Sequence, residues 1–131
     1  SIVVGINNLI SRQDYLNQIN VFPVPDGDTG TNMAFTVNEI LEGTSGTVSS
    51  KIGEMSQEVA DLALDGARGN SGAILAQFFV GLSEGLEGKD TMSVKDFANA
   101  FSKASDNAWE ALSNPQEGTI LTIFKDLSKF L

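Results

Sequence analysis

Apolar residues recur three and four positions apart along almost the whole chain, and this spacing constrains the fold more than any other feature. The clearest stripe begins after Ser93 and ends before Pro115. Side chains at this spacing share one face of an α-helix, which is stable only when that face is buried. No segment shows the competing alternation of a strand, so the sequence predicts an all-α bundle. The members of this stripe are Val94, Phe97, Phe101, Ala104, Ala108 and Leu112.

Similar stripes, separated by segments rich in Gly, Pro and Ser, predict about six amphipathic helices in all. The first helix should run to about Gln18 with an interruption near Ser11. The second should begin at Gly30 or Thr31 and end before a small, polar run. The remaining helices are expected after a cap at Ser49 or Ser50, after Gly72, after Ser93 and after Gly118.

The composition narrows the chemistry that such a bundle could perform. Neither Cys nor His occurs among the 131 residues, which excludes disulfides, zinc–thiolate sites and histidine general bases. A metal would therefore be held by oxygen atoms, which favours Mg²⁺, Ca²⁺ or Mn²⁺. The formal net charge of −9 disfavours nucleic acid and anionic membrane surfaces as partners. With neither a signal peptide nor a membrane-spanning window, we expect a cytoplasmic protein that does not insert into membranes.

The stretch from Asn20 to Met33 carries the strongest chemical signal. It reads N-V-F-P-V-P-D-G-D-T-G-T-N-M and places Asp26 and Asp28 in a turn built from prolines, Pro23 among them, and glycines. An Asp-Gly pair is also an ordinary turn signal, in which case the carboxylates merely solvate the turn. A helix follows directly, however, and unpaired N–H groups over residues 29–33 would hold a phosphate beside a cation.

Two later segments also open helices. The first, Gly66–Gly72, reads G-A-R-G-N-S-G, and its glycines let the backbone approach a ligand closely. The alternative is a tight turn between helices, and Arg68 could face a transferring phosphoryl group or simply lie on the surface. The second segment, Pro115–Ile120, reads P-Q-E-G-T-I and taken alone is typical of a linker.

In this order and in a helical context, the three motifs resemble the nucleotide-binding L domain of dihydroxyacetone kinases. The resemblance is closest to the branch seen in the A subunit of bacterial fatty acid kinase, and it covers essentially the whole chain. It implies an antiparallel barrel of eight helices that binds a nucleotide at one end through two Mg²⁺ ions held by Asp carboxylates. The chain stops at Leu131 inside an apolar stripe. We therefore expect residues 1–131 to be a single nucleotide-binding domain without its last helices.

The resemblance assigns roles residue by residue. Asp26 and Asp28 would be metal ligands, and the third ligand would be Asn20 or water. Arg68 is the one catalytic candidate, although the dihydroxyacetone branch has a small residue at that place. The nucleotide would be bound by Thr29, Gly30, Thr31, Asn32, Gly69, Asn70, Ser71, Gly118 and Thr119.

The implied function is that of a Mg²⁺–ATP/ADP-binding domain in a phosphotransferase. A separate lipid- or triose-binding subunit would hold the acceptor, which is either a fatty acid that becomes an acyl phosphate or a dihydroxyacetone-like triose. One alternative is a regulatory module that retains ADP without turnover. Another is a helical interaction domain with a degenerate site, against which the intact pair of aspartates argues. A barrel that lacks helices would expose apolar surface, so this chain alone could form a homodimer and be inactive as a kinase.

Overall fold

A computed structural model describes residues 2–22, 24–46 and 48–131, and over these ranges the chain forms helices and loops without a strand. The predicted turn residue Pro23 lies outside the described residues. The all-α prediction is confirmed. No helix in the described ranges combines the length and the apolar character that crossing a bilayer requires. The helices are α1 (Ile2–Ser11), α2 (Gln13–Gln18), α3 (Thr29–Gly43), α4 (Ile52–Asp65), α5 (Gly69–Leu86), α6 (Val94–Glu110) and α7 (Ile120–Phe130).

The first two helices account for the difference between these seven helices and the six expected. The sequence predicted one helix with an interruption, and the structure breaks it at Arg12, which separates α1 from α2. The starts of α3 at Thr29 and of α7 at Ile120, behind its cap Thr119, lie one or two residues from the expected ones. Helix α5 was expected after Gly72 but starts at Gly69, inside the glycine-rich segment.

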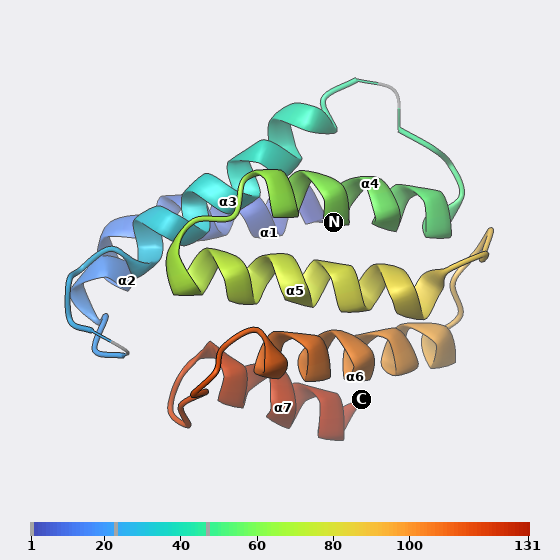
Figure 1. Ribbon diagram of the computed structural model, residues 1–131. Coiled ribbons are helices and arrows are strands. Elements are labelled where there is room, and N and C mark those ends of the chain that lie inside the picture. The colour runs from blue at the N-terminus through green and yellow to red at the C-terminus, as the bar shows by residue number, and fades with distance from the viewer. Residues whose placement is uncertain (1, 23, 47) are drawn as a thin grey trace.

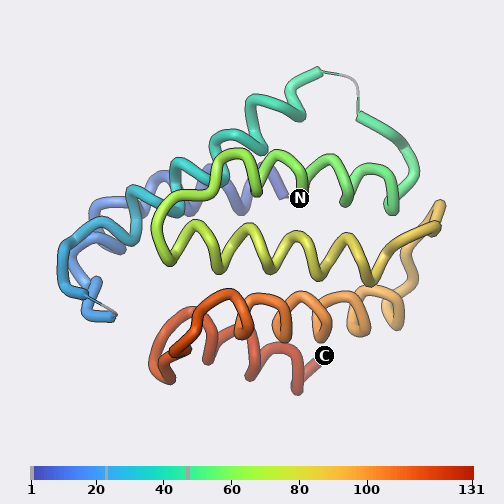
Figure 2. The backbone as a smooth tube through the Cα atoms, viewed as in Figure 1, coloured from blue at the N-terminus to red at the C-terminus, as the bar shows by residue number. Residues whose placement is uncertain are grey.

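Helix α5 is the centre of the arrangement and packs against α3, α4 and α6. Figures 1 and 2 show that α4, α5, α6 and α7 follow one another in alternating directions, while α3 is inclined to them and lies above α5 in this view. Because alternate helices run the same way, the N-terminal ends of α3, α5 and α7 all lie at one end of the molecule (Figure 1). The fold thus gathers the three motifs that are far apart in the sequence.

Glycines allow α5 and α6 to pack backbone against backbone. A Cβ atom at Gly81 would lie 2.7 Å from the Cα atom of Ala104, and one at Gly85 would lie 2.5 Å from the Cα atom of Ala100. Only Gly permits so close an approach, since any side chain would push the helices apart. The C-terminal half of α5 is thereby fixed, which in turn fixes the direction of its N-terminal end.

Two apolar clusters share α5. The first is formed with α1, α3 and α4 and includes Ile6, Ile40 and Val59. The second is formed with α6 and α7, where the rings of Phe78 and Phe124 stack with centroids 4.3 Å apart. Burial of this kind contributes roughly 1.5–3 kcal/mol for each large side chain, so α5 is anchored from both sides.

The predicted cap of α6 is confirmed, and the predicted cap of α4 is wrong. Ser93 caps α6 as expected, since its hydroxyl accepts the N–H of Asp96 at 3.1 Å while the Asp96 carboxylate accepts the N–H of Ser93 at 2.9 Å. The cap expected at Ser49 or Ser50 is wrong, because α4 begins after Lys51, which makes no side-chain cap. Ser49 lies two positions before the N-cap residue Lys51, and its hydroxyl accepts the Lys51 N–H at 3.2 Å rather than an N–H of α4.

Candidate functional site

A cavity of about 810 Å³ opens where the N-terminal ends of α3, α5 and α7 come together. Its walls come from α2, the loop before α3, the first turns of α3 and α5, and the segment from Leu112 into α7. Much of this surface is aliphatic, and the polar side chains gather at the helix starts. The predicted site residues on this lining are Asn20, Asp26, Asp28, Thr29, Asn32, Gly69, Asn70, Ser71, Gly118 and Thr119.

The starts of α3 and α5 contact each other directly. The hydroxyl of Ser71 donates to the carbonyl oxygen of Thr29 at 3.3 Å. Gly69 adopts a φ of +61° and faces the Asn32 side chain so closely that a Cβ atom there would collide with the Asn32 amide. The fully buried hydroxyl of Thr36 lies one turn deeper and donates to the Asn32 carbonyl at 2.9 Å. The two predicted motifs are therefore parts of one rigid surface.

Asn20 joins the two ends of the loop that carries the aspartates. Its Oδ1 atom accepts the N–H groups of Asp28 at 3.1 Å and Thr29 at 3.2 Å. Its Nδ2 atom donates to the carbonyl oxygens of Val24 at 3.0 Å and Phe22 at 3.4 Å. Both polar atoms of this side chain are thus engaged within the loop, and its predicted role as a metal ligand stays a prediction.

The expectation of unpaired N–H groups over residues 29–33 is wrong for Thr29, Thr31 and Asn32, the last of which donates to the carbonyl oxygen of Asp28 at 2.9 Å. The N–H of Thr29 binds Asn20, and the N–H of Thr31 donates to Oδ1 of Asn17 at 3.0 Å. The physical reason is that side chains from α2 and the following loop reach the start of α3 and satisfy its first donors. Sequence reasoning missed Asn17, because one of several polar residues on a short helix gives no separate signal.

Gly30 and Thr31 lie on the side of α3 that faces α2, and neither is among the residues that line the cavity. The Thr31 hydroxyl accepts from Nδ2 of Asn17 at 2.9 Å and from Nε2 of Gln13 at 3.2 Å. A Cβ atom at Gly30 would collide with the carbonyl oxygen of Gln13. These two residues therefore hold α2 against α3 in this structure, and their predicted contact with a nucleotide stays a prediction.

The start of α5, like that of α3, has no side-chain cap from its own N-cap residue, but in the described part of the chain no other side chain takes its first N–H groups either. Arg68 occupies that position with extended backbone, and its side chain makes no capping hydrogen bond. Its guanidinium lies 3.7 Å above the ring of Phe35, and Arg68 does not line the cavity. The residues that follow, Gly69 to Ser71, do line it, so the first turn of α5 borders the cavity with its positive dipole end.

The start of α7 is closed by its own hydroxyl groups. The Thr119 side chain accepts the N–H of Leu121 at 3.3 Å, and the N–H of Gly118 donates to the Thr122 hydroxyl at 2.9 Å. Thr122 and Lys125 also donate to Glu117, and these hydrogen bonds hold the pKa of that carboxyl below its ordinary value. The third motif thus brings a pre-formed wall to the cavity.

Asp26 and Asp28 are the carboxylates on the cavity lining. In the described part of the chain, no group of three or more acidic, His or Cys side chains is placed to hold a metal. Mg²⁺ typically takes one or two protein carboxylates and completes its octahedron with waters and substrate phosphates. The donor set at this loop therefore fits Mg²⁺ bound together with a phosphate ligand.

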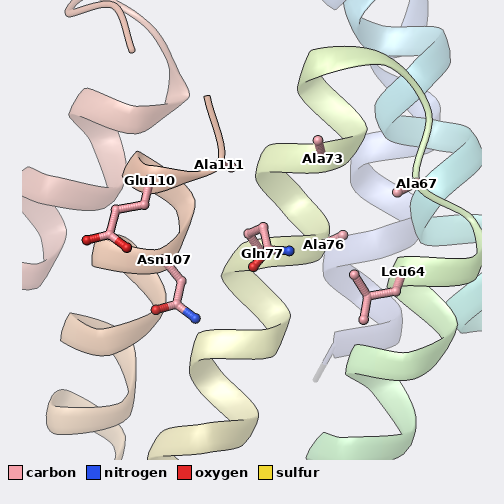
Figure 3. A pocket seen from close by; sticks show the side chains of 8 residues that line it. All are labelled: Leu64, Ala67, Ala73, Ala76, Gln77, Asn107, Glu110 and Ala111. Carbon is pink, nitrogen blue, oxygen red and sulfur yellow. The ribbon is translucent and has the colours of Figure 1, made fainter. Parts of the chain in front are cut away.

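A second hollow of about 440 Å³ lies on the outer face between α4, α5 and α6 (Figure 3). Its lining is mainly small and apolar, and it contains none of the predicted site residues. Glu110 is its single carboxylate, so it offers no paired acids for a cation. The lining residues are Leu64, Ala67, Ala73, Ala76, Gln77, Asn107, Glu110 and Ala111. The cavity at the helix starts is therefore the candidate site.

The geometry of the site agrees with the family to which the sequence is related. The DAK2 domain family matches residues 23–131 of the chain. This chain belongs to the DAK2 domain family. DAK2 domains are nucleotide-binding domains of the dihydroxyacetone kinase family, and members generally bind ADP or ATP. The matched residues include the aspartate loop, the start of α5 and the start of α7.

Longer relatives of this DAK2 chain occur in staphylococci. An uncharacterized protein of Staphylococcus saprophyticus is 45% identical over 125 residues, which cover 95% of this chain and 23% of the relative. An uncharacterized protein of Staphylococcus epidermidis is 44% identical over 128 residues, or 98% of this chain and 23% of the relative. One from Staphylococcus aureus is 41% identical over the same share of both chains. The chain thus spans about a quarter of the length of these relatives.

Proposed function

We propose that this chain is the Mg²⁺–ATP/ADP-binding domain of a phosphotransferase. The observation that carries the proposal is that the aspartate loop and the start of α5 line one cavity and are joined by the bond from Ser71 to Thr29. A carboxylate pair and a helix N-terminus on one surface suit a divalent ion and the phosphate chain that it neutralises. The aliphatic walls, which include Ile19 and Ile120, suit the base of a nucleotide.

In this proposal the residues of the chain position the reactants. Asp26 and Asp28 would hold Mg²⁺, and the N–H groups of Gly69 to Ser71 would bind phosphate oxygens. Mg²⁺, when bound, would neutralise phosphate charge and favour the transfer of the terminal phosphoryl group. The aliphatic walls would exclude water, so that the acceptor oxygen rather than water takes the phosphoryl group and ADP leaves. A chain without His or Cys suffices for this chemistry, because positioning and charge stabilisation dominate phosphoryl transfer.

The finer assignment follows the motif N-V-F-P-V-P-D-G-D-T-G, which resembles the fatty acid kinase branch. We propose that the acceptor is a fatty acid, which becomes an acyl phosphate, or a dihydroxyacetone-like triose, and that a separate subunit holds it. Because this chain covers 23% of its relatives, the activity of the whole protein is part of this proposal. The second candidate function, a module that retains ADP, would use the same contacts without turnover.

Calorimetric titration of ATP and ADP, with and without Mg²⁺, tests the proposal. We expect binding that requires Mg²⁺, since the carboxylates alone would repel the phosphates. Nucleotide binding that is equally strong without Mg²⁺, or no binding at all, would contradict the assignment. ADP that stays bound through purification and does not exchange with ATP would favour the retained-nucleotide module over the kinase.

A further inference from the structure

The side chain of Asn20 uses its full hydrogen-bonding capacity inside one short loop. An amide side chain offers two N–H donors and two acceptor lone pairs. Oδ1 of Asn20 accepts from the N–H groups of Asp28 and Thr29, and Nδ2 donates to the carbonyl oxygens of Val24 and Phe22. The side chain therefore connects the beginning of the loop with its end.

In the described part of this loop, residues 19–22 and 24–28, little else orders the backbone. Val24 is 57% exposed and Phe22 is 49% exposed, so apolar burial does not fix the backbone between α2 and α3. Among the described loop residues there is a local turn in which the N–H of Asp26 donates to the carbonyl oxygen of Val24 at 2.9 Å. The Asn20 carboxamide is consequently the main link that fixes where Asp26 and Asp28 stand relative to the first turn of α3.

We propose that Asn20 is a positioning residue that clamps the aspartate loop through its side-chain amide, and that it is not itself a metal ligand. The clamp sets the separation of the two carboxylates before a cation arrives, which lowers the ordering cost of binding. Its link to Mg²⁺ rests on the proposed function, whereas its effect on the loop does not.

Asn20→Asp distinguishes the two roles because they predict opposite effects. A metal ligand would become stronger, since a carboxylate oxygen binds Mg²⁺ better than an amide oxygen does. A clamp would become weaker, because the second carboxylate oxygen would replace Nδ2 and face the carbonyl oxygens of Val24 and Phe22. Asn38→Asp is the matched control, because it adds the same charge on the exposed side of α3, where Asn38 donates only to Glu42.

The first measurement is a calorimetric titration with Mg²⁺ in the presence of ADP. We expect Asn20→Asp to weaken the apparent Mg²⁺ affinity by about 10- to 100-fold, the usual effect of losing a group that orients metal ligands. The Asn38→Asp variant should stay close to wild type. An Asn20→Asp protein that binds Mg²⁺ as tightly as wild type, or more tightly, would overturn the clamp.

The second measurement is amide hydrogen exchange of the metal-free protein, which requires no ligand. We expect Asn20→Ala to accelerate exchange at Asp28 and Thr29, whose N–H groups lose their acceptor, while the amides in the middle of α5 keep their wild-type rates. Unchanged exchange at Asp28 and Thr29 would overturn the clamp. If circular dichroism shows that Asn20→Ala does not fold, the direction of the change in Mg²⁺ affinity in Asn20→Asp decides between a clamp and a metal ligand. A wild-type protein without Mg²⁺-dependent binding would refute the proposed function, and the exchange data would still decide the clamp.

Discussion

The starts of α3 and α5 look alike in the sequence and differ in the structure. Both are glycine-rich, both open a helix on the cavity, and both were predicted to hold an anion. At α3 the N–H groups of Thr29 and Thr31 are taken by two asparagine side chains, and the preceding loop carries the carboxylates. At α5 no side chain in the described part of the chain takes the first N–H groups, and the N-cap residue Arg68 lies over the ring of Phe35.

In our proposal the two helix starts divide two tasks, the binding of a cation and the binding of a phosphate, which conflict at a single helix start. Carboxylates at Asp26 and Asp28 would repel a phosphate that sat on the amides of α3. With those amides satisfied by uncharged asparagines, the negative charge remains available for a cation. The start of α5 bears no acidic side chain in its first turn, and in our proposal it is the helix start that binds the phosphate. A glycine-rich helix start is therefore not sufficient to predict an anion site, because neighbouring side chains decide whether its donors are free.

Removing a carboxylate from the loop before α3 should weaken Mg²⁺-dependent nucleotide binding more than any of the later substitutions. We expect Asp28→Ala to weaken Mg²⁺-dependent nucleotide binding by at least about 100-fold, since loss of a direct ligand should exceed the effect of losing a supporting group. Helix content should not change, because Asp28 is exposed. Calorimetry and circular dichroism check the two expectations. Asp61→Asn on α4 is the control, and equal affinities in the two variants would remove the metal assignment from this loop.

A side chain added where the starts of α3 and α5 touch should cause the next largest loss of nucleotide affinity. Gly69→Ala places a Cβ atom against the Asn32 amide at a φ of +61°, so the start of α5 must move. We expect roughly a tenfold loss of nucleotide affinity, which corresponds to about 1.4 kcal/mol. Gly88→Ala is a matched control, because Gly88 has a φ of +71° but no atom within 4 Å of its Cβ position.

The two variants share the conformational cost of a left-handed alanine and differ in the contact with Asn32. A difference in ADP affinity, measured by calorimetry, therefore isolates that contact. Both proteins should show a similar fall in thermal stability from the backbone cost, about 1–2 kcal/mol. If Gly88→Ala lost nucleotide affinity as strongly as Gly69→Ala, the effect would be general destabilisation and the comparison of the two starts would fail.

Arg68 tests whether the start of α5 also carries a catalytic group. Arg68→Ala should leave nucleotide affinity unchanged, because the side chain lies on Phe35 and does not line the cavity. We expect a loss of stability of about 0.5–1 kcal/mol from the exposed cation–π contact. Thermal unfolding and calorimetry measure the two quantities. A loss of turnover at unchanged affinity would instead support the catalytic role that the sequence suggested.

Much of the fold was predictable because it follows from local pattern. The stripe after Ser93 and the interruption near Ser11 are read directly from spacing, and alternating helix directions then place the three motifs at one end. The side-chain contacts were not predictable, because Asn17 and Asn20 reach the start of α3 from outside it. Their hydrogen bonds depend on how α2 sits against α3, which the packing of Gly30 on Gln13 decides. Composition and periodicity contain no information on such a contact.

The start of α6 is capped by its own residues and does not line the cavity. A substitution there should therefore have the smallest effect, and only on stability. Lys89 and then Ser93 hydrogen-bond the Asp96 carboxylate, and these bonds hold its pKa well below the ordinary 3.8. Stability from a carboxyl group with a lowered pKa is present above the ordinary pKa and is lost as the pH falls through the folded value. We therefore expect Asp96→Asn to lower the melting temperature modestly at pH 7 and by less at pH 2, which lies below the ordinary pKa, without changing nucleotide affinity. Thermal unfolding at both pH values tests this, and a variant that lost nucleotide affinity would show that helix starts remote from the cavity also control it.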